Sequence, residues 1–377
     1  MKKKILVVGA SNWQSSGIKK LIKSGYDVHL ADTRNKFLKN YKNIQKHKIK
    51  LLKANEFLKL IKKHKIQNCI SFNSDFAVPV VNFLNKKLGE NFYKPKIISI
   101  FTKKISFRNF QKKNNLHHPF FLTKYKKILN YKDYNSNFLI KPNIASGSKG
   151  IFKSNKFTEK KKFIKNFNYA KDISSDNKVI FERFIPGREY GGNCYILNGE
   201  IVDLRITKKF VQNNIVIGHV YPSSLNLNLQ TKIKDELLVY FKKLNIVNSI
   251  INFDLKIYKN KIYILELALR GGANGITEII KYATNFDYEK IVYEKKLNKL
   301  KKDNFYYNSY IFGSKFNGNL KSLKLNLNNY NFVLKKILFQ KNNEKVFKFK
   351  SNDLSIGMII FKKKKITDFN NKKKFFE

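Results

Sequence analysis

Short apolar runs alternate with segments of helical apolar spacing through the N-terminal part of the chain. The predicted strands are Ile5–Val8, Tyr26–Ala31 and Asn68–Phe72. The predicted helices are Ser15–Lys23, Phe57–His64 and Phe76–Leu88. Strands that alternate with helices predict βαβ units and a parallel sheet, because neighbouring parallel strands need a crossover connection.

The loop after the first predicted strand, Gly9–Asn12, argues against a dinucleotide site. It lacks the second and third glycines of the dinucleotide fingerprint, although Asp32 closes the second strand. We therefore expect this region to help form a substrate cleft rather than to bind NAD.

Residues 138–151 combine a short apolar strand with a loop of small residues. Lys141 stands at the end of the strand, and Ser146, Gly147 and Ser148 follow in the loop. Glycine lets backbone amides turn toward an anion, while serine hydroxyls add donors and lysine adds a charge. The pattern predicts a cradle for nucleotide phosphates. An ordinary hairpin connection is the alternative, because Gly/Ser loops are common there.

Two helices are predicted on either side of this loop. The first lies within the segment 102–119 and ends before Pro119. It places Lys104 and Arg108 on one face because they are four residues apart. Two exposed basic residues are the alternative interpretation. The second spans Thr158–Ala170, with Thr158 as its N-cap.

A strand is predicted within residues 179–190, where it carries Glu182 and Phe184. A Pro-Gly turn then precedes Arg188 and Glu189. Such a strand can offer backbone groups to an adenine ring and a carboxylate to a ribose. A buried strand with one structural glutamate is the alternative.

Residues 251–272 predict a β-hairpin that turns near Asn260. If the loop is Lys259–Lys261, Asp254 lies directly across from Glu266 on one face. Two carboxylates this close repel unless a cation lies between them, and hard oxygen ligands suit Mg²⁺. A lysine paired with one carboxylate is the alternative. The predicted faces of the return strand are Tyr263, Leu265 and Leu267 on one side, and Ile262, Ile264 and Glu266 on the other.

The pattern as a whole predicts an α/β (α+β overall) chain of three parts. The further predicted helices are Thr277–Lys281 and Tyr288–Tyr293, and the further strands Tyr310–Gly313 and Ile356–Phe361. The expected parts are a small parallel βαβ domain over residues 1–96, a two-lobed domain with the predicted nucleotide and metal site over 97–297, and a small β-rich piece over 298–377.

Composition changes this picture little. The formal net charge of +51 suggests nucleic acid, but the lysines are dispersed and only six arginines occur, so no clustered basic face is expected. No apolar run reaches the length of a membrane helix. Cys69 and Cys194 match no metal or redox spacing, which favours a reducing cytoplasm. In a chain that avoids arginine, each arginine marks a place where a planar fork of donors is needed.

Taken together, the motifs over residues 100–285 resemble the ATP-grasp superfamily, of the carboxylate–amine ligase type related in fold to biotin carboxylase and carbamoyl-phosphate synthase. K-K-I-S-F-R resembles its first phosphate-binding helix, and K-P-N-I-A-S-G-S-K-G its second lysine and phosphate loop. F-E-R-F-I-P-G-R-E resembles its adenine hinge and ribose carboxylate. The implied cofactor-binding residues are Lys104, Lys141, Ser146, Gly147, Ser148, Glu182, Arg183, Phe184 and Glu189.

The hairpin resembles the metal site of the same superfamily. The resemblance implies Asp254 and Glu266 as metal ligands, and Arg270 and Lys141 as catalytic residues. Two positions depart from the usual pattern. Lys103 stands where an aspartate is usual, and Ala268 stands where many members carry an asparagine, which puts a second Mg²⁺ in doubt.

The resemblance implies a cytoplasmic ligase that uses ATP and Mg²⁺, with Mn²⁺ as an alternative ion. ATP would phosphorylate a carboxylate, and an amine would attack the acyl phosphate to give an amide, ADP and phosphate. The expected partners are small carboxylates and amines, without membrane or nucleic acid, and a homodimer is one option for assembly. The residues expected to border the acceptor site are Arg205, Lys208, His219, Gly272 and Asn274.

Three other functions stay open. A carboxylase of the same fold would activate bicarbonate, and a non-catalytic ATP-binding regulator would fit the alanine at position 268. A basic nucleic-acid-binding protein would show a steep salt dependence that does not change on Asp254→Asn.

Overall fold

The N-terminal part of the chain forms a parallel sheet with helices on both faces. The computed structural model describes residues 2–34, 41, 44–51, 53–130, 137–154, 160–212, 214–295, 306–311, 333–338 and 357–363. The strand order of the first sheet is β3-β2-β1-β4. Its strands are β1 (Lys4–Val8), β2 (Asp27–Asp32), β3 (Gln45–Lys48) and β4 (Asn68–Ile70). Its helical elements are η1 (Asn12–Gln14), α1 (Ser15–Lys23), α3 (Ala54–His64) and α4 (Val78–Lys87).

The predicted parallel βαβ unit is confirmed, with one strand missed. Strand β3 has the sequence Q-K-H-K and three of its four residues are exposed. It therefore carries no apolar signal, and it pairs in register with β2 at the edge of the sheet.

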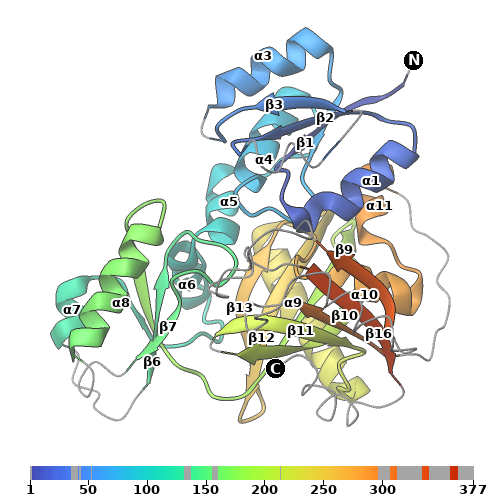
Figure 1. Cartoon of the computed structure of the whole chain (residues 1–377). Coiled ribbons are helices and arrows are strands. Elements are labelled where there is room, and N and C mark those ends of the chain that lie inside the picture. The colour runs from blue at the N-terminus through green and yellow to red at the C-terminus, as the bar shows by residue number, and fades with distance from the viewer. Residues whose placement is uncertain are drawn as a thin grey trace.

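A second, small sheet lies to one side of the molecule (Figure 1). Its strand order is β5-β8-β6-β7 and its pairs are antiparallel. The chain reaches it through α5 (Pro95–Thr102) and α6 (Lys104–Lys113). The predicted helix within 102–119 is present as α6, but it is shorter than expected, and α5 was not predicted. The elements of this part are β5 (Phe121–Leu122), α7 (Tyr125–Asn130), β6 (Phe138–Pro142), β7 (Phe152–Ser154), α8 (Lys160–Ile173) and β8 (Val179–Arg183). The predicted cap Thr158 lies outside the described residues.

The third sheet is the largest and contains eight antiparallel strands in the order β13-β12-β9-β10-β11-β14-β16-β15. Its strands are β9 (Arg188–Leu197), β10 (Glu200–Gln212), β11 (Ile215–Tyr221), β12 (Ser249–Tyr258), β13 (Lys261–Ala268), β14 (Tyr306–Ile311), β15 (Val333–Leu338) and β16 (Gly357–Lys363). The helices beside it are α9 (Leu227–Leu244), α10 (Ile276–Thr284) and α11 (Tyr288–Glu294).

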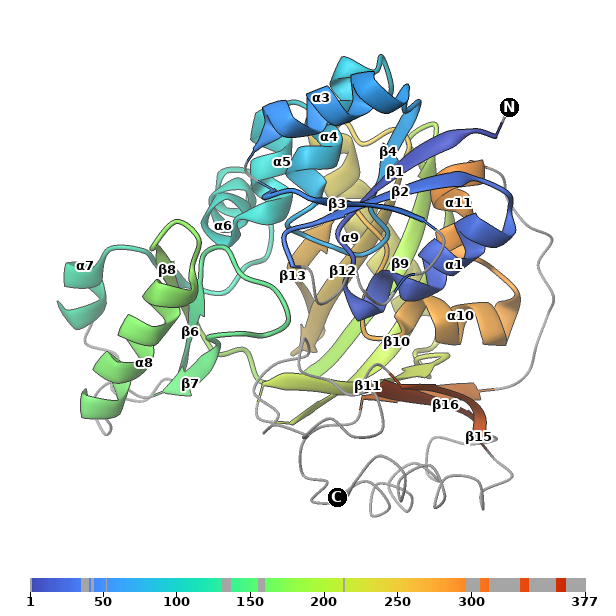
Figure 2. The same ribbon diagram turned by 45° about the horizontal axis from the view of Figure 1, so that its top comes forward.

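Strand alternation separates the two faces of the large sheet. Cys194 and Ile251 pack with α9 in the main core, whereas their neighbours Tyr195 and Ile250 pack with α10 and α11. Figure 2 shows α11 beside α1 of the N-terminal part, where Tyr293 joins the core of the first sheet. The face of the large sheet opposite α9 is therefore the one turned toward the other two sheets.

The expected fold class is confirmed: a small parallel sheet, two antiparallel sheets and a β-rich C-terminal part occur together. The C-terminal strands β14 to β16 continue the large sheet, while most of residues 298–377 lies outside the described residues. The domain limits at residues 96 and 297 stay a prediction.

Two further expectations concern the compartment. Among the helices of the described residues, none combines the length and apolarity that crossing a bilayer requires. Both cysteines are buried free thiols, and burial raises the pKa of Cys69 to about 12.

Candidate functional site

A cleft of about 930 Å³ opens where the three sheets face one another. Loops that follow β1, β2 and β4 form one wall, and the loop 145–149 with β6 forms a second. The third wall is the face of the large sheet opposite α9, with side chains from β10, β11, β12 and β13. The expected contribution of the N-terminal part to a cleft is therefore confirmed.

The hairpin of β12 and β13 pairs Asp254 with Glu266, as predicted, but by another route. The turn contains only Lys259 and Asn260, both in the left-handed region with φ of 47° and 58°, because Tyr258 pairs with Lys261. A β-bulge then shifts the register. The predicted three-residue loop is wrong, and the bulge restores the pairing of the two carboxylates.

The bulge also changes which residues of β13 share a face, so the predicted faces are wrong. The extra residue is Leu265, because Leu255 pairs with Ile264 and the preceding Asp254 pairs with Glu266. Leu267 consequently joins Ile264 in the core instead of opposing it. Both Leu265 and Glu266 line the cleft, so one bulge presents an apolar side chain and a carboxylate in succession.

Lys209 is the principal cation beside these carboxylates, and the sequence analysis missed it. Its Nζ lies 2.8 Å from Oδ2 of Asp254 and 2.9 Å from Oε1 of Glu189, and its side chain is 5% exposed. Burial alone would lower the pKa of Lys209, but the two carboxylates outweigh burial and raise it. The alternative of a lysine paired with a carboxylate is therefore present at Asp254.

A divalent cation nevertheless fits the donor set. Burial raises the pKa of Asp254, and the charges of Glu189 and Glu266 raise it further against the effect of Lys209. Two further carboxylates therefore act on Asp254 against its one direct lysine partner, and the Glu266 side chain, 3.7 Å from Lys104, is 47% exposed in the cleft. Asn252 lines the cleft directly across the hairpin from Ala268. Its amide nitrogen donates to the carbonyl of Gly192 at 2.7 Å, which leaves its oxygen as the atom suited to a cation.

Glu182 connects the two basic residues on the opposite wall. Its carboxylate accepts hydrogen bonds from Nε of Arg108 at 2.8 Å and from Nζ of Lys141 at 2.7 Å. Burial alone would raise the pKa of Glu182, but the charges of Arg108 and Lys141 lower it to about 2. The glutamate is 1% exposed and lies behind the wall of the cleft. The structure thus gives it a contact that orients Lys141, which lines the cleft.

The predicted phosphate loop faces the metal hairpin. Ser146, Gly147 and Ser148 line the cleft, and φ is 66° at Gly147 and 59° at Ser148. Two consecutive residues with positive φ give a tight turn, a conformation in which backbone amides can face an anion. Lys104 bridges the two sides, because its Nζ lies 3.4 Å from the carbonyl oxygen of Ala145 and 3.7 Å from Oε1 of Glu266.

Four apolar side chains also line the cleft and are called the apolar slot: Leu139, Ile151, Phe184 and Leu265. The ammonium groups of Lys153 and Lys256 lie 4.1 and 4.5 Å from the centre of the Phe184 ring. A flat aromatic ligand would replace water between apolar side chains here while its polar edge meets strand ends.

Arg270 lies where the N-terminal part meets the large sheet. Its Nε and Nη2 donate to the carboxylate of Asp75 at 2.6 and 2.7 Å, and its Nη1 donates to the carbonyl of Gly271 at 2.8 Å. Asp75 follows β4, at the carboxyl end of the parallel sheet, where ligands of such sheets bind. That position was a usable signal for Asp75, which the sequence analysis missed.

His219 has its tautomer determined by its neighbours. The hydroxyl of Thr207 donates to the carbonyl of Gly191 at 2.9 Å, so it must accept from Nδ1 of His219 at 3.0 Å. Nε2 of His219 is then an acceptor, and it is buried without a hydrogen-bond partner among the described residues. Burial and the charge of Lys209 lower the pKa of this histidine to about 3. A neutral acceptor therefore lines the cleft.

Asn274 is the other predicted acceptor residue that lines the cleft. It adopts φ of 60°, and its amide oxygen is buried without a partner in the described part of the chain. A donor group of a bound molecule would satisfy this oxygen.

Besides Glu182, four predicted residues do not line the cleft. Arg183 is exposed and stacks on Phe120, on the other side of β8 from Glu182. Arg205 donates to Asp203, and Lys208 lies over the ring of Phe210. Lys208 faces away because β10 turns Lys209 toward the cleft. Arg205 shares the face of Lys209 but lies farther along β10, beside Phe286.

Gly272 is the fourth of these residues, and its packing explains why glycine is needed there. A Cβ at this position would lie 2.1 Å from Cγ2 of Ile276, and its amide donates to Oδ1 of Asn193 at 3.0 Å. Gly272, which was expected to border the acceptor site, therefore packs against Ile276 and does not line the cleft. The roles of the residues that do line the cleft stay predictions.

A family model and several solved structures match this chain. Residues 134–278 match the family model of the ATP-grasp domain, which confirms the resemblance seen in the motifs. The fold is similar to phosphoribosylglycinamide synthetase from Anaerococcus prevotii, at 17% identity, with 100% of this chain and 98% of that chain covered and a TM-score of 0.71. It is also similar to L-amino acid ligase from Bacillus licheniformis (13%, 100% and 97%, 0.78). A third similar structure is N5-carboxyaminoimidazole synthetase from Staphylococcus aureus complexed with ADP (12%, 100% and 98%, 0.79). Curated proteins give no match.

Proposed function

Because residues 134–278 form an ATP-grasp domain, we propose that this protein is a Mg²⁺- and ATP-dependent ligase that joins a carboxylate to an amine. The observation that carries the proposal is the facing of two opposite charge sets across one cleft. Asp254 and Glu266 lie on the large sheet, and Lys104 and Lys141 lie on the opposite wall. Phosphoryl transfer needs mainly alignment and charge neutralisation from the protein, which such an arrangement supplies.

ATP would lie with its adenine in the apolar slot. Leu265 and Phe184 would cover the ring, and the carboxylate of Glu189 would accept from the ribose hydroxyls. Lys209 holds the other side of Glu189, so this carboxylate is preset for that contact. The adenine slot and the carboxylate pair are adjacent because one β-bulge presents Leu265 and Glu266 in succession.

The phosphates would meet the basic wall. Lys104 and Lys141 would contact the β- and γ-phosphates together with the amides of residues 146–148. Glu182 holds Lys141 at 2.7 Å, so little rotamer freedom remains to be lost on binding. Mg²⁺ held by Asp254 and Glu266 would neutralise charge on the phosphates during transfer.

The reaction would proceed in two balanced steps. A carboxylate oxygen of the substrate attacks the γ-phosphorus, the bond to the β-phosphate oxygen breaks, and ADP leaves. An amine nitrogen then attacks the acyl carbon, the bond from that carbon to the phosphate oxygen breaks, and the amine loses one proton. Arg270 retains two N–H groups beyond its three bonds to Asp75 and Gly271, and these can contact the acyl phosphate.

His219 is suited to the amine. Its neutral Nε2 can accept a hydrogen bond from an amine N–H and so orient the nitrogen lone pair toward the acyl carbon. A pKa of about 3 makes it too weak a base to remove the proton at neutral pH, so its proposed role is positioning.

The test is ADP release from ATP and Mg²⁺ with pooled small carboxylates and amines. We expect release to require one member of each pool and to be lost in Glu266→Gln. Glu200→Gln is the matched control, because Glu200 is exposed at the far end of β10. Release that depends on bicarbonate would instead identify a carboxylase of the same fold. Failure of the wild type to bind ATP would refute the proposal.

A further inference from the structure

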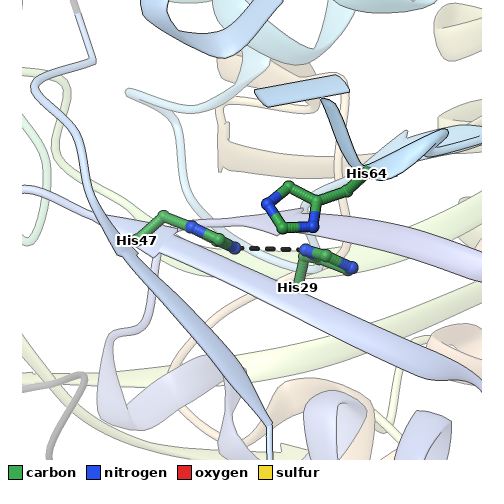
Figure 3. A group of neighbouring side chains, drawn as sticks. All are labelled: His29, His47 and His64. Carbon is green, nitrogen blue, oxygen red and sulfur yellow. Dashed lines mark hydrogen bonds between the residues drawn. The ribbon is translucent and has the colours of Figure 1, made fainter. Parts of the chain in front are cut away.

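Three of the six histidines of this chain meet on one face of the N-terminal sheet, away from the cleft (Figure 3). His29 lies on β2, His47 on the edge strand β3, and His64 is the last residue of α3. None of the three lines the cleft described above. A structural histidine is common, but three that converge from separate elements need an explanation of their own.

Strand parity and helix packing bring the rings together. His29 and Ala31 share one face of β2, and Ala31 is paired with His47 on β3, so both histidines point to the same side of the sheet. Helix α3 packs on that side, where Phe57 contacts the same core as Ala31. The helix ends at His64, which Figure 3 shows above the other two rings.

The nitrogen atoms of the cluster are close enough to share one ion. Nδ1 of His29 lies 3.1 Å from Nε2 of His47, and one ligand nitrogen from each ring lies within 4.8 Å of the others. Two imidazole nitrogens on a tetrahedral Zn²⁺ are separated by about 3.3 Å, given bonds of 2.0–2.1 Å. Modest side-chain rotation would therefore bring all three nitrogens to one metal ion.

Few polar contacts hold the three rings in place. One hydrogen bond joins His29 to His47, and His64 contacts both rings at centroid distances of 4.6 and 5.4 Å. Nε2 of His29 is buried and has no hydrogen-bond partner among the described residues. Burial lowers the pKa of His29 and, with the charges of the neighbouring histidines and Lys63, lowers that of His47 to about 4.

We propose that His29, His47 and His64 bind one divalent transition-metal ion of the Zn²⁺ type. Neutral imidazoles suit Zn²⁺, Ni²⁺ or Cu²⁺, whereas Mg²⁺ and Ca²⁺ need oxygen ligands, which these three side chains lack. His29 is fully buried and the other two are half-buried, so the ion enters from the solvent side and keeps a position for water. Asp27 favours the cation electrostatically, whereas Lys4 and Lys63 oppose it.

The ion would fasten an otherwise weakly held edge. Gln45 and Lys46 of β3 are exposed, so this strand has little apolar contact beyond its ladder with β2. A metal shared by β2, β3 and α3 would clip the edge strand to the sheet and to the helix.

The experiment is calorimetric titration of the full chain with Zn²⁺, without nucleotide or other substrate. The buffer contains millimolar Mg²⁺, which saturates the carboxylates of the cleft. The wild type should bind one Zn²⁺, and Co²⁺ should give the visible absorption of a four-coordinate site. His64→Ala should lower Zn²⁺ affinity by more than about tenfold and remove the Co²⁺ spectrum. His117→Ala is the matched control, because His117 is exposed between α6 and β5. This variant should bind Zn²⁺ with the affinity of the wild type.

His47→Gln tests the same site from the edge strand, in case His64→Ala does not fold. Circular dichroism establishes that each variant is folded before titration. A wild type without saturable Zn²⁺ binding overturns the proposal, and so does wild-type affinity in either folded variant. The test measures Zn²⁺ binding and not the joining of a carboxylate to an amine, so its outcome is independent of the proposed ligase activity.

Discussion

Replacing Glu182 with glutamine removes the charge that holds two cations inside the protein. Arg108 and Lys141 both bond its carboxylate, and the Glu182 and Arg108 side chains are each no more than 2% exposed. The distance between the ordinary pKa of 4.5 and the folded value of about 2 corresponds to roughly 3 kcal/mol of stability at pH 7. Removal of one partner from a buried ion pair has a cost of similar size, about 3–5 kcal/mol.

The pH dependence follows from the sign of this shift. The folded pKa is depressed, so the contribution is present in full above the unfolded pKa of 4.5 and is lost as the pH falls through about 2. At pH 3, between the unfolded and folded pKa values, roughly 1 kcal/mol of it should remain, by the same linkage relation. The difference between wild type and Glu182→Gln should therefore shrink in acid.

Amide hydrogen exchange in β6 and β8 is the suitable assay, because a chain of this size is not expected to unfold in one step. Glu56→Gln is the matched control: Glu56 forms a 2.6 Å pair with Lys53, but both side chains are largely exposed, so a change below about 0.5 kcal/mol is expected. An opening free energy in Glu182→Gln within that same margin of wild type would refute the reasoning. A difference that does not shrink between pH 7 and pH 3 would refute it as well.

Three further predictions concern the cleft. Lys209→Met leaves the carboxylate of Asp254 without its internal cation, so thermal stability should fall in EDTA and recover with Mg²⁺; equal loss in both conditions would contradict the metal assignment. Asp75→Asn frees the guanidinium of Arg270, so kcat/KM should drop by about 10²-fold while the Kd for ATP stays unchanged. A change confined to ATP binding would show that the pair does not serve the acyl transfer. His219→Asn should raise the KM for the amine and leave the KM for ATP unchanged, as steady-state kinetics would measure. Because the pKa of His219 is about 3, kcat should show no inflection near pH 6.5 that this variant removes.

The carboxylate pair shows how far local sequence patterns reach. The pairing of Asp254 with Glu266 is as expected, and both residues line the cleft. The bulge at Leu265 could not be predicted, because part of what holds it comes from far away in the chain. Arg108 donates to the carbonyl oxygen of Leu265 at 3.0 Å across 157 residues. The alternation of apolar and polar residues within one strand cannot predict such a distant contact.

Missed residues share the same cause. Lys208 and Lys209 are identical in type and adjacent, so only the register of β10 decides which one meets Asp254. Asp75 meets Arg270 across 195 residues. Strand β3 is polar throughout, and its existence depends on pairing with β2, which periodicity cannot reveal. An apolar pattern was not sufficient either, because helices α5 and α9 bury apolar side chains and were not among the predicted elements.

Arginine usage explains why part of the site was nevertheless visible in the sequence. In a chain so rich in lysine, arginine was expected where a planar fork of donors is needed, and three of the six arginines bind a carboxylate through two nitrogen atoms with little exposure. The pairs are Arg108–Glu182, Arg205–Asp203 and Arg270–Asp75. The pairs of Arg108 and Arg270 border the cleft, whereas the pair of Arg205 lies beside Phe286. Arginine in this chain therefore indicates a buried charge pair in general, and not only a site residue. Distinguishing a catalytic fork from a structural one requires the fold, because only the fold shows which guanidinium still reaches open space.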